Sequence, residues 1–246
     1  MYRSLNAESI VSTAERLCSR IEERFPDSGL GRVSRELLRV ARESVARAEW
    51  LRRPCWIVRA AVCVTIAAIL ASGIFAAVSI RVSIQIREIA DLLQAVDAGV
   101  NEMILLALAL IFLVSVETRM KRNKALRALH QLRSIAHVID MHQLTKDPEA
   151  IATLVQPTAS SPQRKLTPFQ LSRYLDYCSE LLSLTSKLAA LHVQHLRDPV
   201  VLGAVNDVEA LTDGLSQKIW QKIAVLEMKL QGDLAARSLH ERKGGT

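Results

Sequence analysis

The chain has 246 residues and a formal net charge of +7, and it is half hydrophobic but only 4% aromatic. This length allows a membrane hairpin and one modest helical body, and it excludes an additional catalytic domain of ordinary size. Apolar residues recur every three or four positions almost throughout, and alternating strand patterns are nearly absent, so the sequence predicts an all-α fold. Because the basic residues concentrate beside two apolar segments, we expect no nucleic-acid partner.

Residues 1–54 are predicted to form an N-terminal helical hairpin in the cytoplasm. An apolar stripe runs at helical spacing from Ile10 to Phe25, and residues 26–29 then break the helix with Pro, Asp, Ser and Gly. A second helix is expected from Leu30 to Arg53, with Glu43 and Arg47 as a supporting pair one turn apart. Pro54 ends it.

Residues 55–117 are predicted to form a transmembrane hairpin of two helices. Residues 60–80 contain no charged side chain and reach about 30 Å as a helix, the thickness of the hydrocarbon core of a bilayer. The second span is placed at about residues 98–116, which puts Asn101 and Glu102 near one membrane face. The amphipathic connection, residues 81–97, is expected to lie on the outer leaflet after a bend near Arg81.

Few positions in the spans are polar or small. Gly73 and Ala77 lie four residues apart, a spacing that permits close approach of another helix, either from a second copy or from the second span. If several copies line a pore, the polar side chains that would face it are Thr65, Ser72, Asn101 and Glu102. For Glu102 the simpler interpretation is a carboxylate at the membrane interface.

Residues 118–236 are predicted to form an antiparallel helical bundle in the cytoplasm. The second span is expected to continue as a helix to about Leu144, and residues 157–165 are expected to be a linker. Thr167 and Gln170 form a predicted capping box, and Asp198 repeats the N-cap pattern before a proline, so two further long helices follow. Residues 237–246 are expected to be a disordered basic tail.

The aromatic and nucleophilic residues of this region fit packing better than catalysis. Tyr174, Tyr177 and Trp220 fall beside leucines at helical spacing and are expected to be packing anchors. Ser183 and Lys187 lack the Ser-x-x-Lys spacing, and the sequence has no glycine-rich phosphate loop, Gly-x-Ser-x-Gly or His-Glu-x-x-His pattern. We therefore expect a protein that is not an enzyme and needs no cofactor.

One group of residues has the character of metal ligands. Two pairs, each separated by one helical turn, could face each other on two helices of a bundle: His137 with Asp140, and His192 with His195. Surface histidines or hydrogen-bonded core histidines explain the same spacing more simply. A metal site built on these four residues is retained as a minor alternative.

The distribution of basic residues predicts the orientation in the membrane. Arginines and lysines crowd the outer flanks of both spans, whereas the connection holds only Arg81 and Arg87, so both termini are expected in the cytoplasm. The bias for arginine over lysine and the lack of a eukaryotic targeting signal favour a bacterial inner membrane. Membrane lipid is one expected partner, and a cytoplasmic protein or further copies of the chain are the other.

Three functions follow from these patterns. The first is a scaffold, sensor or regulatory protein whose cytoplasmic helical domain binds a partner. The alternative is a homo-oligomeric two-span pore or permeabilising effector, which would be largely hydrophobic because its spans hold few polar residues. The third is a metal-dependent enzyme built on the histidine and aspartate cluster.

Overall fold

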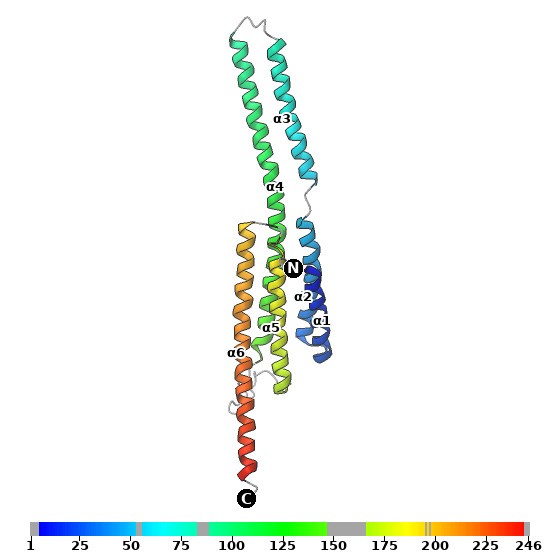
Figure 1. Cartoon of the computed structure of the whole chain (residues 1–246), viewed down its shortest axis with the longest axis vertical. Coiled ribbons are helices and arrows are strands. Elements are labelled where there is room, and N and C mark those ends of the chain that lie inside the picture. Colours follow the sequence, from blue (N-terminus) through cyan, green and yellow to red (C-terminus); the bar gives the residue numbers. More distant parts are fainter. Residues whose placement is uncertain are drawn as a thin grey trace. The chain divides into compact units, whose positions relative to one another are not determined.

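Six α-helices make up the ordered elements of the chain in the computed structural model (Figure 1), which describes residues 5–52, 56–82, 89–146, 166–194, 196 and 198–243. They are α1 (Ala7–Arg24), α2 (Gly29–Arg52), α3 (Trp56–Val82), α4 (Ile89–Leu144), α5 (Pro168–Leu191) and α6 (Pro199–Lys243). No strand occurs among the described residues. The prediction of an all-α fold is therefore confirmed.

The chain divides into two compact units. The first, which we call the body, comprises Met1–Trp50 and Ala125–Thr246, and the second, the span unit, comprises Leu51–Lys124. The boundaries fall inside α2 and α4, so each of these helices contributes residues to both units.

The helices begin where side chains can accept hydrogen bonds from their first backbone N–H groups. At α1, Asn6 Oδ1 accepts bonds from the N–H groups of Glu8 (2.9 Å) and Ser9 (3.2 Å). At α5, Thr167 and Gln170 make both bonds of a capping box, as the sequence predicted. At α6, Asp198 Oδ1 accepts bonds from the next two free N–H groups, at 2.9 and 3.2 Å, which confirms the predicted N-cap.

In the body, α1 contacts both α2 and α5. Two ion pairs join α1 to α2, Glu15 with Arg42 at 2.8 Å and Glu22 with Arg35 at 2.9 Å, and their order along the chain makes the two helices antiparallel. Phe25, just after α1, packs edge-on against two tyrosines of α5, with ring centroids 5.5 Å from Tyr174 and 6.2 Å from Tyr177. The predicted anchoring role of both tyrosines is thus confirmed.

The centre of the body is formed by large aliphatic side chains at helical spacing. Every helix with residues in this unit supplies some of them, and α5 also packs along α6. Those that are almost completely buried include Leu17, Ile21, Leu30, Leu37, Leu132, Ile139, Leu175, Leu182, Leu188, Ile219 and Leu226. This hydrophobic core is the main source of stability of the body, because isolated amphipathic helices are only marginally stable in water.

In the span unit, both helices extend beyond the predicted spans. Helix α3 starts at Trp56 and continues to Val82, past the bend expected near Arg81, and the six residues that follow lie outside the described part. Residues 89–97, expected to form a separate helix of the connection, belong to α4 together with the second apolar segment. No proline separates the two stretches, and a helix tolerates Gly99 at a cost of about 1 kcal/mol.

In the C-terminal region, α6 is longer than the sequence suggested. It continues to Lys243, whereas residues 237–246 were expected to be a disordered tail. The added segment is rich in good helix formers, and the first glycines occur only at positions 244 and 245. A short helix predicted at 147–156 and the predicted linker at 157–165 lie outside the described residues.

Candidate functional site

Among the described residues, two helices contain a segment that is long and apolar enough to cross a membrane. These segments lie within Trp56–Phe75 of α3 and Val96–Leu144 of α4, and nothing in the most apolar part of either is buried. Exposed fractions reach 85% at Ile57 and 65% at Phe112. A core helix of a soluble protein has the opposite pattern, because its apolar face is covered by neighbouring helices. The exposure of so many apolar side chains on these helices thus fits a membrane better than a protein interior.

The polar hydroxyl groups of α3 bond to their own helix. Thr65 Oγ1 donates to the carbonyl oxygen of Ala61 at 2.9 Å, and Ser72 Oγ donates to that of Ile69 at 3.0 Å. In a lipid environment these bonds would give both hydroxyl groups a partner without water in a pore. The two residues therefore do not by themselves require a pore.

The remaining predicted positions of the span unit have few neighbours. Asn101 and Glu102 are exposed on α4. A methyl group added at Gly73 would meet nothing within 4 Å, so no described atom uses the close approach that this glycine permits. The backbone of Ala77 belongs to α3, and its side chain lies outside the described part of the structure.

The three predicted metal ligands that the structure describes do not form one site. His137 is exposed, Asp140 Oδ1 accepts a bond from Gln143 Nε2 at 2.6 Å, and His192 is completely buried. His195 lies outside the described residues. Within the described part of the chain, no three His, Cys, Asp or Glu side chains lie close enough together to hold a metal ion. The first three candidates therefore do not form such a group.

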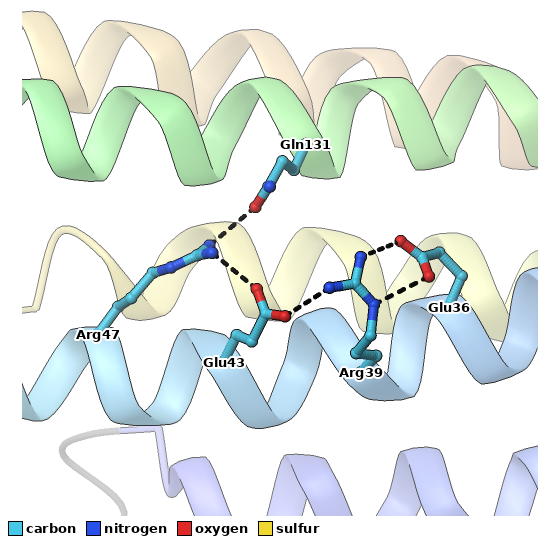
Figure 2. Close-up of polar contacts among 5 residues, drawn as sticks. All are labelled: Glu36, Arg39, Glu43, Arg47 and Gln131. Carbon is cyan, nitrogen blue, oxygen red and sulfur yellow. Dashed lines mark hydrogen bonds and ion pairs between the residues drawn. The ribbon is translucent and has the colours of Figure 1, made fainter.

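A chain of polar contacts joins α2 to α4 in the body (Figure 2). Glu43 accepts bonds from Arg39 at 2.6 Å and from Arg47 at 2.7 Å, which confirms the predicted pair of Glu43 with Arg47. Arg39 also donates to both carboxylate oxygens of Glu36. Arg47 in turn donates to Gln131 Oε1 on α4 at 2.8 Å. Arg47 thus links the charged face of α2 to the neighbouring helix.

Among the described residues of the body, two buried polar atoms have no hydrogen-bond partner: Ser44 Oγ on α2 and His192 Nε2 after α5. His192 Nδ1 lies 3.0 Å from the carbonyl oxygen of Leu188, so Nδ1 carries the proton and Nε2 of the neutral ring is a bare acceptor. Burial, reinforced by the positive charge of Arg47, lowers the pKa of His192. The neutral ring is therefore the stable form in the folded body.

Near the end of α4, a second polar contact joins that helix to α6, and a close approach brings it near α2. Lys222 of α6 donates to the carbonyl oxygen (2.9 Å) and to Oε1 (2.7 Å) of the buried Gln143. The ring of His142 lies so close to Gly29 that a methyl group there would sit 2.3 Å from His142 Cε1. Burial, followed by the charges of Arg32 and Lys146, lowers the pKa of His142.

The nucleophiles of this region are poorly suited to catalysis. Burial raises the pKa of the Cys178 thiol to about 12, so its reactive thiolate form is strongly disfavoured. Lys187 Nζ lies 2.5 Å from Ser183 Oγ, but both side chains are exposed. A lysine that activates a serine needs a desolvated site in which it loses its proton. These contacts fit structure better than nucleophilic chemistry.

A groove of about 990 Å³ runs between α1, α5 and α6 of the body. Its deeper walls are aliphatic side chains such as Ile10, Leu184 and Ile223, which are almost completely buried. Trp220 lines it as well, but this side chain is 65% exposed. The prediction that Trp220 is a packing anchor is therefore wrong: its neighbours Ile219 and Ile223 are buried, but Trp220 itself lies at the edge of the core, and sequence periodicity does not distinguish an edge from the interior.

Comparison with known proteins adds no relative: no protein-family model, curated protein or solved structure matches the chain. Sequence reasoning did not find the unpartnered atoms of Ser44 and His192, because burial of a polar group depends on contacts between distant helices. The exposure of Trp220 likewise has no signal in the sequence.

Proposed function

We propose that the chain is an integral membrane protein with two spans, whose helical body binds a protein partner as a scaffold, sensor or regulatory module. One observation carries the proposal: two long apolar helices have no buried residue in their most apolar parts, among the residues described. Such an area of exposed apolar surface is strongly unfavourable in water. Lipid or further copies of the chain would remove it from water.

Charge next to the spans supports an orientation with both termini in the cytoplasm. Arg59 is exposed near the start of α3. Four cations follow the apolar part of α4, at positions 119, 121, 122 and 124, and Lys121 pairs with Glu117 at 2.8 Å. Such an excess of positive charge next to a span is typical of the cytoplasmic side of a membrane. A bacterial inner membrane is the proposed location.

The partner-binding role is supported by the body, which is a compact unit with its own hydrophobic core and can therefore present a stable surface to a partner. We propose that the body performs no catalysis. The second candidate, a pore made of several copies, gains little from Thr65 and Ser72, because both hydroxyl groups already have partners in their own helix. A metal-dependent enzyme gains no support from the three described ligand candidates.

Reporter fusions test the proposed topology. Alkaline phosphatase is active only outside the cytoplasm and green fluorescent protein fluoresces only inside, so fusions after Asp97 and after Lys243 should give opposite results. We expect phosphatase activity at Asp97 and fluorescence at Lys243. The same signal at both junctions would contradict a two-span hairpin.

The mass of the particle after mild extraction distinguishes the roles. A monomer or dimer that carries a second protein supports the scaffold. A closed homo-oligomer that conducts ions in liposomes supports the pore and would replace our proposal.

A further inference from the structure

The groove between α1, α5 and α6 has an open, mostly apolar lining with an aromatic side chain at its edge. Small-molecule pockets bury most of their ligand, whereas this groove is open to solvent along one side. The walls supplied by α1 and α5 belong to neighbouring antiparallel helices, because Arg20 binds Glu180 while the later Phe25 contacts the earlier Tyr174. A helix of a partner could pack into this groove in the same way as helices pack within a bundle.

Trp220 is the strongest candidate contact for a partner. Large aromatic side chains dominate the binding energy of protein interfaces when a partner covers them. Phe169, on α5, is exposed to the same degree (64%), but the guanidinium group of Arg24 lies over its ring at 5.6 Å. Trp220 instead lines the groove, together with the buried Ile223. An apolar side chain of a partner would cover both residues.

The charged residues of the groove leave one positive charge without an acidic partner among the described contacts. Arg173 pairs with Asp176 at 3.1 Å, and Glu180 pairs with Arg20 at 3.2 Å. Lys187 bonds only to neutral oxygen atoms of Ser183, the hydroxyl at 2.5 Å and the carbonyl at 3.5 Å. The groove therefore complements an occupant that carries a negative charge opposite Lys187.

We propose that this groove binds an acidic amphipathic helix of a partner protein, with its apolar face on Trp220 and Ile223 and a carboxylate bonded to Lys187. This inference rests on the proposed function, because it names the surface and the chemistry through which the body recognises its partner. It commits to a helix rather than a compact ligand because the groove is open and bounded by helices.

The test uses the purified full chain in nanodiscs and two synthetic probes. The first is a helical peptide of about 18 residues, or five turns, with leucine on one face and glutamate on the other. The second has lysine in place of every glutamate. Binding is measured by fluorescence anisotropy of the labelled peptides. We expect the acidic peptide to bind at least tenfold more tightly than the basic one.

Matched variants assign the binding to the groove. Trp220→Ala should weaken binding of the acidic peptide at least tenfold, and Phe169→Ala, at an equally exposed aromatic outside the groove, should change it less than twofold. Lys187→Glu should weaken the acidic peptide and strengthen the basic one, whereas Lys218→Glu, at an exposed lysine of α6 that does not line the groove, should have little effect. Circular dichroism shows whether each variant retains its helices. If Trp220→Ala does not fold, the change in binding of the two peptides to Lys187→Glu tests whether they bind in the groove.

Three outcomes would overturn the inference: neither peptide binds, both bind equally, or binding does not respond to Trp220→Ala and Lys187→Glu. Binding of laurate that depends on Trp220, without binding of either peptide, would also overturn it and assign the groove to a small amphiphile. These results leave the proposed membrane location untouched, because membrane extraction tests it independently. Release of the chain from membranes would defeat the proposed function whether or not a peptide binds.

Discussion

The body and the span unit are both built from helices rich in apolar side chains, but they expose these side chains differently. In the body, Leu182 and Ile219 have no exposed surface, whereas in the span unit Leu108 and Phe112 are 57% and 65% exposed. Helical spacing alone therefore does not determine what an apolar face contacts. What separates the two units is the amount of apolar surface around each helix: a single stripe is covered by neighbouring helices, and a helix that is apolar on all sides needs lipid.

The largest effect should come from a cavity in the body. Leu182→Ala removes a completely buried side chain, so the free energy of unfolding should fall by about 2–5 kcal/mol. Leu202→Ala, at a half-exposed leucine of α6, should lower it by about 0.5 kcal/mol or less. Urea unfolding in detergent, followed by circular dichroism, measures both. Equal effects would show that the body does not have the core described.

A charge placed in a span should act on membrane insertion. Leu108→Arg puts a guanidinium group in the middle of the second apolar segment, at a cost of about 3 kcal/mol for insertion. The fraction of protein in the membrane should fall sharply, as measured by fractionation of cells. Val138→Arg, at an exposed residue of α4 in the body, should leave that fraction unchanged. If Leu108→Arg is as harmless as Val138→Arg, this segment does not contact lipid.

The close approach of α2 and α4 gives a smaller effect. Gly29→Ala places a methyl group 2.3 Å from His142 Cε1, so the ring has to move, and the free energy of unfolding should fall by about 1–3 kcal/mol.

Gly31→Ala is the matched control two residues later in α2. The added methyl group would make an ordinary contact 3.4 Å from Ser28 Oγ, so stability should stay level or rise by up to about 1 kcal/mol. Thermal unfolding of both variants measures the difference, and a loss of the same size in both would show that the His142 contact is unimportant.

The smallest effect concerns pH. Because the pKa of His192 is lower in the folded body than its ordinary value of 6.5, the unfolded chain binds the proton first as the solution becomes acidic. The stabilising contribution of the neutral ring is complete above about pH 6.5 and falls at lower pH, by at most about 1.4 kcal/mol per pH unit. His142 contributes in the same direction.

Unfolding midpoints in urea between about pH 7.5 and pH 5 measure this dependence. His192→Gln should flatten it, and His130→Gln, at an exposed histidine of α4, should not. An unchanged dependence in His192→Gln would show that the buried ring is not responsible.

Local chemistry allowed much of the fold to be predicted from the sequence. The capping box of Thr167 and Gln170 and the N-cap of Asp198 depend only on residues within three positions of each other, and both are present. The end of the first helix was also predicted near residues 26–29, and the left-handed backbone of Asp27, with φ of 56°, lies in that turn.

Properties that depend on distant helices were not predictable. Residues 89–97 were expected to form a separate helix because their amphipathic pattern differs from that of the following span, but a change of pattern does not break a helix without a proline or a cap. The exposure of Trp220 and the unpartnered atoms of Ser44 and His192 depend on which helices cover them. Pattern analysis of a single sequence does not determine those neighbours.

Alkaline carbonate extraction of membranes from cells that express the full chain tests directly whether α3 and α4 span the membrane. We expect the chain to remain in the membrane pellet and to be released only by detergent, because its exposed apolar helices would lie in lipid. Release of the intact chain into the carbonate supernatant would contradict the two-span assignment and with it the proposed function.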